Sequence, residues 1–283
     1  MKTAWQPRLA IPILICLVTR VLVAAVIGWS VIVMRPRMAT SPSAELAQSP
    51  APLTGDKSSA DATENPRYVA ERRRMVDEQL RGRDITDAAV LAAMRRIPRH
   101  RFMPQDVQNL AYADMPAPIG HYQTISQPYI VALMTQVVRP RPESRVLDIG
   151  TGSGYQAAVL AELCKEVYSI EILKPLADSA QKRLAAMGYK NIMVRCGDGY
   201  KGWPEKAPFD IIIVAAAPDH VPEPLVEQLA SGGRLVIPVG SYYQELLMIE
   251  KQKDRTIRRT SIVPVRFVPM LGEAEKANSP KPK

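Results

Sequence analysis

Residues 146–155 read VLDIGTGSGY, and this stretch decides the fold. Its first four residues form a short apolar run that carries one acid, and a short apolar run bounded by glycine is typical of a buried strand. Glycines then alternate with Thr151 and Ser153. Because glycine has no side chain, such a turn lets the backbone come close to a ligand. A strand, a glycine turn and a helix in this order predict a binding site at the carboxyl end of a central strand in an open α/β sheet.

The chain beyond Pro140 and Pro142 alternates short apolar runs with longer helical patterns, which indicates βαβ units and a parallel sheet. Helices are expected at residues 154–164 and 174–187. Strands are expected at residues 145–149, 166–171, 191–196, 209–215, 234–239, 245–250 and 257–267. The pattern predicts one α/β domain of the Rossmann type with a mostly parallel, seven-stranded sheet.

Two helices are expected before the sheet begins, as an N-terminal helical extension. Asn65 followed by Pro66 is a helix-start signature, and Gly82 marks the end of that helix. The second helix is expected to begin at Thr86 and to stop before Pro98.

The segment between this extension and the sheet carries two further signals. Residues 115–123 include Pro116, Pro118 and Gly120, which predict a loop without regular structure. Ser126 directly precedes a proline-initiated apolar run that ends at residue 138, so Ser126 is expected to be the N-cap of another helix.

The glycine turn differs from a dinucleotide fingerprint, which requires a small residue at the position that Tyr155 occupies. Alternating glycines after a strand acid instead resemble the S-adenosylmethionine motif of methyltransferases, in which the turn contacts the aminoacyl part of the cofactor. Taken alone, the turn also fits a purely structural role. The cofactor-binding residues expected here are Asp148, Gly150, Thr151, Gly152 and Gly154.

Two more acids lie at the ends of the next two predicted strands. Glu171 follows the glycine turn by about 20 residues, where a carboxylate accepts hydrogen bonds from both ribose hydroxyls. Asp198 and Gly199 end the third strand, and the Asp198 carboxylate suits the adenine amino group. A helix-start carboxylate and a turn residue are the structural alternatives, but three acids at three consecutive strand ends favour a cofactor site.

The chain resembles the protein-L-isoaspartate O-methyltransferase family in several separate motifs. The matching pieces are residues 118–120 (PIG), 124–129 (TISQPY), 148–156 (DIGTGSGYQ), 197–199 (GDG), 208–210 (PFD), 215–218 (AAAP), 232–240 (GGRLVIPVG) and 266–269 (RFVP). They occur in the family's order over roughly residues 67–271. The resemblance implies a class I methyltransferase fold.

The same resemblance implies methyl transfer from S-adenosylmethionine to the free carboxylate of an isoaspartyl residue in an aged protein or peptide. The ester would then close spontaneously to a succinimide, whose hydrolysis returns some normal aspartate, so the implied function is protein repair. Because that carboxylate is already ionised at pH 7, no general base is needed. The family's motif places Ser126 at the active site, where its hydroxyl would hold the substrate carboxylate.

Two other classes of function remain open on the sequence. A nucleic-acid methyltransferase would share the cofactor fold and use the basic stretch at residues 67–101, but residues 215–218 (AAAP) replace the Asn/Asp-Pro-Pro-aromatic motif of amine-methylating enzymes. Neither Cys164 nor Cys196 follows a proline, as the nucleophile of a cytosine-C5 enzyme would. A non-enzymatic, membrane-tethered binding module is the second alternative, because fold alone does not establish catalysis.

Charge and cysteine content exclude other partners. The net charge is +9, but five basic residues and no acidic one lie in the first 37 residues, so the remainder has 32 basic against 28 acidic residues. That excess is too small to indicate a nucleic-acid partner, and the basic stretch at residues 67–101 is interpreted as a solvated face. Cys16, Cys164 and Cys196 form no CxxC pair, so neither a metal site nor a redox motif is expected and each is predicted to be a buried, small apolar side chain.

Composition divides the chain into four parts. Residues 1–38 form a hydrophobic membrane anchor or signal segment, in which residues 9–34 are long enough to cross a bilayer. Residues 39–64 are a flexible linker, residues 65–272 the methyltransferase domain and residues 273–283 a disordered tail. The expected location is a cytoplasmic catalytic domain, tethered to the membrane through residues 9–34, with export as the alternative.

Overall fold

The computed structural model describes residues 64–274. The predicted anchor at residues 1–38, residues 39–63 of the predicted linker and residues 275–283 of the predicted tail lie outside the described residues. Within residues 64–274, no helix is both long enough and apolar enough to cross a bilayer.

Seven strands form one sheet, in the order β5-β4-β3-β6-β7-β8-β9. Their bounds are β3 Arg145–Ile149, β4 Glu166–Glu171, β5 Ile192–Cys196, β6 Phe209–Val214, β7 Leu229–Val239, β8 Gln244–Lys251 and β9 Ile257–Val265. Strands β3 to β7 pair in parallel, whereas β8 is antiparallel to both β7 and β9. The predicted mostly parallel, seven-stranded sheet is confirmed. The direction of winding changes between β3 and β6, and ligands bind at such a point in these folds.

Alternating residues of the strands build two apolar layers, one on each face of the sheet. Val146 and Ile211 belong to the core that includes α4 (Pro128–Val137), α5 (Tyr155–Ala161) and α6 (Lys174–Ala186). Leu147 and Ile212 face the other way and pack with Trp203 and with Leu225 of α7 (Glu223–Glu227). Because both faces are covered, the central strands are apolar almost throughout.

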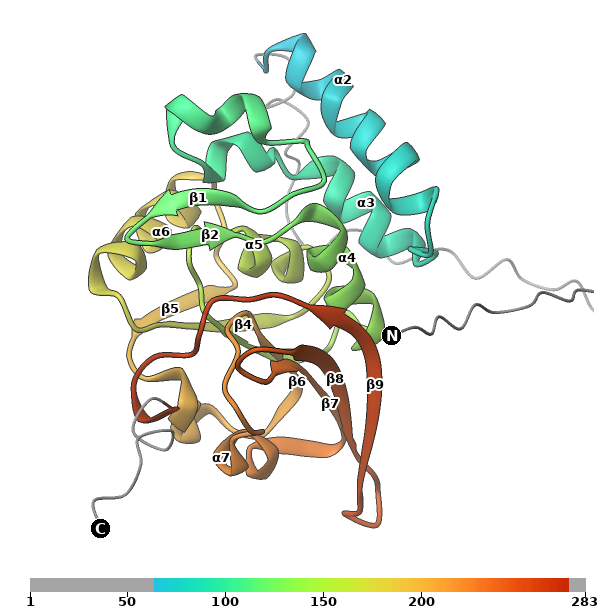
Figure 1. Cartoon of the computed structure of the whole chain (residues 1–283), viewed down its shortest axis with the longest axis vertical. Helices are drawn as coiled ribbons and strands as arrows, with labels where there is room; N and C mark the ends of the chain where they lie inside the picture. The colour runs from blue at the N-terminus through green and yellow to red at the C-terminus, as the bar shows by residue number, and fades with distance from the viewer. Residues whose placement is uncertain (1–63, 275–283) are drawn as a thin grey trace, which may run out of the picture. The chain divides into compact units, whose positions relative to one another are not determined.

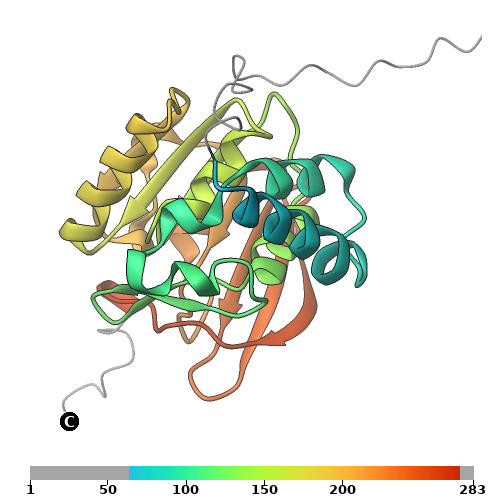
Figure 2. The same cartoon turned by 90° about the horizontal axis from the view of Figure 1, so that it is seen from above.

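The N-terminal extension packs on the α4 and α5 side, at the top of Figure 1, and α6 belongs to the same core and lies at the left edge of Figure 2. Its elements are α2 (Pro66–Arg74), which continues as the π-helical turn η1 (Met75–Arg81), and α3 (Ala88–Arg96). Asn65 caps α2, as expected. The expected start of α3 at Thr86 is wrong by one residue, because the Asp87 carboxylate accepts hydrogen bonds from the N–H groups of Ala89 and Val90. Short 3-10 turns complete the fold: η2 (Arg99–Phe102), η3 (Gln105–Leu110), η4 (Gly199–Lys201) and η5 (Pro204–Lys206).

The predicted loop at residues 115–123 is wrong, because most of it forms a β-hairpin. Strands β1 (Ala117–Gly120) and β2 (Gln123–Ile125) pair antiparallel as a separate two-stranded sheet. Both strands are edge strands, which tolerate a proline that donates no hydrogen bond. His121 and Tyr122 make the turn with φ values of 52° and 58°. Left-handed conformations at both turn positions are what a tight hairpin requires, although glycine or asparagine usually supplies them.

The prediction that Ser126 caps α4 is also wrong. The N-cap of α4 is Gln127, and its side chain makes no capping bond. Asp114, from the loop before β1, supplies the acceptor instead. Its carboxylate accepts from the backbone N–H of Tyr129 at 3.1 Å and from the side-chain amide of Gln127 at 2.8 Å. The Ser126 hydroxyl is therefore not needed to start the helix.

Two of the residue environments expected from composition also differ. Cys164 is buried, as predicted, but Cys196 is exposed at the end of β5, and Cys16 lies outside the described residues. The basic stretch is not a uniformly solvated face, because Arg72 is only 2% exposed and Arg99 is fully buried.

Candidate functional site

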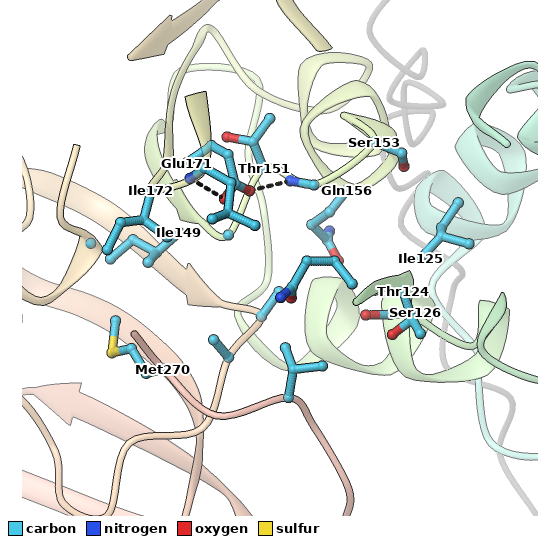
Figure 3. Close-up of a pocket in the computed structure, with 18 of the residues that line it drawn as sticks. Thr124, Ile125, Ser126, Ile149, Thr151, Ser153, Gln156, Glu171, Ile172 and Met270 are labelled. Carbon is cyan, nitrogen blue, oxygen red and sulfur yellow. Dashed lines mark hydrogen bonds between the residues drawn. The ribbon is translucent and has the colours of Figure 1, made fainter. Parts of the chain in front are cut away.

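A pocket opens at the carboxyl ends of β3 and β4, where the sheet topology predicts a ligand site. Four segments line most of it: residues 123–126 after the hairpin, residues 150–153 of the glycine turn, residues 170–173 at the end of β4, and residues 268–271 after β9. Figure 3 shows Thr124 and Ser126 on one side of the pocket, across from Met270. Segments that are far apart in the sequence therefore meet around one cavity.

The glycine turn follows β3 and adopts a backbone that other residues rarely adopt. Gly150, Gly152 and Gly154 have φ values of 89°, 52° and 90°. The turn is held in place because the N–H groups of Gly150 and Thr151 both donate to the carbonyl of Ile170 in β4, at 2.9 and 3.1 Å. The left-handed φ values explain the glycine spacing, and the missing side chains leave backbone open to the pocket.

Glu171 ends β4 and lines the pocket with a carboxylate that is already oriented (Figure 3). One of its oxygens accepts from the Gly152 N–H at 2.8 Å, and the other accepts from the Leu173 N–H at 3.0 Å. Each carboxylate oxygen has a second lone pair, so Glu171 retains acceptor capacity for two hydroxyl groups. The predicted residue is thus present at the pocket wall.

Gly199, Ile149 and Met270 form an apolar part of the pocket wall. An added Cβ at Gly199 would lie 2.3 Å from Cγ2 of Ile149 and 3.5 Å from Cε of Met270. A side chain at position 199 would therefore displace Ile149, so only glycine leaves this apolar part of the wall in place.

Asp198 does not line the pocket, although its neighbour Gly199 does. Its carboxylate caps η4 by accepting from the Tyr200 N–H at 2.9 Å, and its other oxygen accepts from the Glu273 N–H at 2.9 Å. The structure thus gives Asp198 the turn role that the sequence left as an alternative, together with a contact to the C-terminal segment.

Asp148 lies beneath the glycine turn and is fully buried, outside the pocket lining. Its Oδ2 accepts from the Ser169 hydroxyl at 2.6 Å, and Ser169 in turn lies 2.6 Å from the Thr151 hydroxyl. Its Oδ1 has no hydrogen-bond partner among the described residues. A buried carboxylate oxygen without a donor is costly, so this atom is suited to a donor that a ligand or a water molecule brings.

The burial of Asp148 predicts a specific pH dependence of stability. Desolvation raises the pKa of Asp148 from 3.8 to about 7, the Glu171 charge adds to this rise, and the Ser169 hydroxyl opposes it. Between these pH values the folded chain binds the proton that the unfolded chain has lost, so this group lowers the free energy of unfolding as pH rises from about 4 to 7. Asp148→Asn is expected to remove that component.

Denaturant unfolding of both proteins without ligand, at intervals from pH 5 to 8, measures the effect. The difference in unfolding free energy, variant minus wild type, is expected to increase toward pH 8. A difference that is constant across this range would show that Asp148 keeps an ordinary pKa in the folded protein.

Ser126 lies on the wall opposite Met270, two residues before α4 begins at Pro128 and separated from it by Gln127. The Ser126 side chain is partly exposed, and its hydroxyl makes no hydrogen bond within the described part of the chain. Its carbonyl accepts from Nη2 of Arg99 at 3.1 Å. The backbone is held and the hydroxyl is available, which is the arrangement expected of a group that binds a substrate.

The sequence-based expectation missed the closing strap, defined here as residues 268–271. The strap pairs with Ala217, whose N–H donates to the Val268 carbonyl and whose carbonyl accepts from the Met270 N–H, both at 2.9 Å. This brings Pro269, Met270 and Leu271 to the pocket. The RFVP motif at residues 266–269 marked the segment as part of the family pattern, but nothing local in it indicated a pocket wall.

Gln156 was also missed as a pocket residue. It lies on α5, one residue beyond the glycine turn and Tyr155, and lines the pocket. Its amide nitrogen donates to the Thr135 hydroxyl at 3.0 Å. This hydrogen bond fixes the side-chain amide of Gln156 at the pocket, between the glycine turn and Ser126 (Figure 3).

The whole arrangement matches one known family. A sequence model of protein-L-isoaspartate(D-aspartate) O-methyltransferases matches residues 70–275. The chain belongs to this family. The match spans the hairpin, the glycine turn, the end of β4 and the closing strap, so every segment that builds the pocket falls within the family pattern. The nucleic-acid methyltransferase and the scaffold alternatives gain no support from this finding.

Similar isoaspartate methyltransferases confirm the assignment at high identity. The protein-L-isoaspartate O-methyltransferase of Opitutus terrae is 60% identical over 205 residues, covering 72% of this chain and 88% of the relative. That of Picosynechococcus is 54% identical over 206 residues, covering 73% and 92%. The expected class I methyltransferase fold is confirmed as well.

A solved structure from the same family has the same fold. The structure of a Plasmodium falciparum protein, described as a putative protein-L-isoaspartate O-methyltransferase in complex with S-adenosyl-L-homocysteine, aligns with a TM-score of 0.62 and 27% identity. The alignment covers 71% of this chain and 98% of that structure. The shared fold therefore extends over nearly all of that relative.

Proposed function

We propose that this protein transfers a methyl group from S-adenosylmethionine to the free carboxylate of isoaspartyl residues in damaged proteins and peptides. The observation that carries the proposal is the composition of one pocket, which joins a glycine turn and the Glu171 carboxylate on one wall to a hydroxyl without a partner, that of Ser126, on another. The glycine turn and the Glu171 carboxylate suit a ligand that joins a nucleoside to an amino acid, and the Ser126 hydroxyl suits a carboxylate.

The residues of the cofactor side fit S-adenosylmethionine in shape and in hydrogen bonding. We assign the glycine turn, with Gly150, Thr151 and Gly152, to the amino-acid part, and the Glu171 carboxylate to the ribose hydroxyls. The apolar wall formed by Ile149, Gly199 and Met270 is suited to the adenine ring. Two further residues act on this wall without lining it, since Gly154 caps α5 in a left-handed conformation and Asp148 supports the turn through Ser169 and Thr151. Asp198 is assigned a supporting role through Glu273, just beyond the closing strap, in place of a direct contact to adenine.

Methyl transfer to a carboxylate requires the chain to bind and orient the two substrates and to exclude water. No proton has to be moved. S-adenosylmethionine, when bound, supplies a methyl group bonded to a positively charged sulfur. The isoaspartyl carboxylate has an ordinary pKa near 4, so it arrives ionised at neutral pH. We assign the Ser126 hydroxyl to donate a hydrogen bond to one carboxylate oxygen, which leaves the other oxygen free to face the methyl group. Alignment in a pocket that excludes water then lowers the barrier, because the opposite charges neutralise each other in the transition state.

The test is methyl transfer from labelled S-adenosylmethionine to an isoaspartyl peptide and to a peptide of the same sequence with normal aspartate. Label is expected in the isoaspartyl peptide and not in its normal counterpart. The label is expected to be released by mild base, as for a carboxyl ester. Equal labelling of the two peptides would exclude the repair function.

We further propose that residues 9–34 tether this catalytic domain to a membrane, with the domain in the cytoplasm, where S-adenosylmethionine is available. The support is the long apolar stretch in the sequence and the polar residues 39–64 that separate it from the catalytic domain. An exported protein is the alternative, and protease accessibility of the domain in intact cells distinguishes the two.

Deleting residues 1–60 is expected to leave a soluble enzyme with unchanged kcat and KM for the isoaspartyl peptide. The deletion retains Glu64, which forms an ion pair with Arg72, and Asn65, which caps α2. Fractionation and peptide methylation of the deleted and full-length proteins measure the result. An inactive or insoluble product would show that the N-terminal segment belongs to the catalytic fold.

A further inference from the structure

Arg99 is a fully buried arginine directly behind the proposed substrate wall. It begins η2, and its guanidinium lies 5.8 Å from the ring of Tyr155, a pocket residue. Arginine is almost never fully buried unless its charge is paired, because removing the charge from water is costly. The environment of Arg99 therefore needs an explanation.

The hydrogen bonds of Arg99 go to three backbone carbonyls and, at 3.5 Å, to the sulfur of Met103. Nη1 donates to Ala111 at 2.6 Å, and Nη2 donates to Ser126 at 3.1 Å and to Met115 at 3.4 Å. Met115 and Ser126 stand at the two ends of the β1–β2 hairpin. One guanidinium thus holds together the base of the hairpin whose second strand leads into the pocket wall at residues 123–126.

The positive charge of Arg99 has no counter-charge of its own. No carboxylate within residues 64–274 lies within ion-pair distance of it, and its buried Nε has no hydrogen-bond partner there. The carboxylate that acts on it most is that of Asp114, which is already bound by Arg83 at 3.0 Å and by the start of α4. The carbonyl dipoles offset part of the burial cost and leave the net charge in place.

Arg72 shows what a paired, buried arginine looks like in the same extension. It is 2% exposed, and its guanidinium forms two hydrogen bonds with the Glu64 carboxylate, at 2.6 and 2.8 Å. The further hydrogen bonds of Arg72 to the Arg95 carbonyl and the Tyr112 hydroxyl go to residues that do not line the pocket. The fold therefore neutralises one buried arginine and leaves the other, next to Ser126, without an ionic partner.

We propose that Arg99 is a positioning residue for methyl transfer, whose buried guanidinium fixes the backbone of Ser126 and whose unpaired positive charge favours the arrival of the substrate carboxylate. This inference rests on the proposed function. A charge buried behind the pocket wall, in a region of low dielectric, acts on an incoming anion more strongly than a solvated charge at the same distance, because water does not screen it. The carboxylate that binds at Ser126 supplies the negative charge that the folded chain lacks there.

The test compares Arg99→Met with Arg72→Met in the full-length protein. Both variants are expected to lower thermal stability. Only Arg99→Met is expected to raise KM for the isoaspartyl peptide, by about tenfold or more, as the loss of hydrogen bonding and attraction to a charged group implies. The dissociation constant of S-adenosylmethionine, measured by calorimetry, is expected to stay within about twofold of wild type in both, because neither side chain lines the cofactor wall.

A double-mutant cycle separates positioning from general destabilisation. If Arg99 acts through Ser126, the combined loss in Arg99→Met/Ser126→Ala is smaller than the product of the two single losses. Arg99→Lys keeps the charge but loses the planar fork, so its KM is expected between those of wild type and Arg99→Met. If Arg99→Met does not fold, the KM values of Arg99→Lys and Arg72→Lys for the isoaspartyl peptide are compared instead, and only Arg99→Lys is expected to raise KM.

The outcomes distinguish this inference from the function on which it rests. Wild-type KM in the Arg99 variants, equal KM shifts in the Arg99 and Arg72 variants, or losses that multiply fully in the cycle would overturn the role of Arg99. Failure of the wild-type protein to methylate the isoaspartyl peptide would overturn the proposed function itself.

Discussion

Ser126→Asp is expected to lower kcat/KM for the isoaspartyl peptide by about a thousandfold while the protein stays folded. Two unit charges 4 Å apart near a protein surface interact by about 4 kcal/mol, and each 1.4 kcal/mol is about a factor of ten. The substituted carboxylate would repel the substrate carboxylate from the place where the serine hydroxyl receives it. Stability is expected to change little, because the Ser126 side chain makes no hydrogen bond in the described fold and α4 begins without it.

Ser126→Ala and Ser241→Asp complete this comparison. The alanine variant removes a hydrogen bond to a charged group, worth about 1.5–3 kcal/mol, so kcat/KM is expected to fall about 10- to 100-fold. Because Asp114 caps α4, this loss is not confounded by a damaged helix start. Ser241→Asp adds the same charge on the exposed turn after β7, outside the pocket, and is expected to leave kcat/KM near wild type. Near-normal methylation by Ser126→Asp would place the substrate carboxylate elsewhere.

Glu171→Gln is expected to raise the dissociation constant of S-adenosylmethionine by about a hundredfold. The wild-type carboxylate accepts from the N–H groups of Gly152 and Leu173 and keeps lone pairs for the ribose. The glutamine amide replaces one carboxylate oxygen with an NH2 group, which would face a backbone N–H. The glycine turn and the ribose would both lose hydrogen bonds to a charged acceptor, and each such bond is worth about 1.5–3 kcal/mol. Calorimetric titration with the cofactor measures this change.

Glu166→Gln is the matched control, since Glu166 lies on the same strand at its far end and outside the pocket. Its carboxylate accepts hydrogen bonds from Arg145 and from the Tyr168 hydroxyl. The substitution therefore removes a carboxylate charge from β4 at a position that does not contact the cofactor. Cofactor affinity is expected to be unchanged in Glu166→Gln. Equal affinities of the two variants and the wild type would remove Glu171 from the ribose site.

Much of the sheet was predictable because its signals are local. The apolar runs of β3 and β4 have the bounds that the sequence predicts, and the left-handed glycines of the turn are the residues that such a backbone requires. The hairpin was missed because Pro116, Pro118 and Gly120 usually indicate irregular structure. Edge strands in a two-stranded sheet tolerate these residues, and only pairing with β2 reveals it.

The parts of the site that escaped prediction depend on contacts between distant residues. The cap of α4 comes from Asp114, 15 residues before the Tyr129 N–H that it accepts from, so the local Ser126 signal pointed to the wrong residue. The Asp198 carboxylate, predicted to bind the adenine, also accepts from the Glu273 N–H, a contact between residues 75 positions apart that the sequence pattern did not indicate. Arg99 was grouped with solvated arginines, because composition cannot show that three carbonyls surround it.

The closing strap has a consequence for the order in which the pocket is made. The hairpin, the glycine turn and the end of β4 are all complete by residue 173, whereas one wall of the pocket comes from residues 268–271. On a ribosome, a growing chain that already contains β3, β4 and Ser126 still has a cleft that is open on that side. We therefore expect a chain that stops before residue 268 to bind S-adenosylmethionine more weakly than a chain that contains the strap.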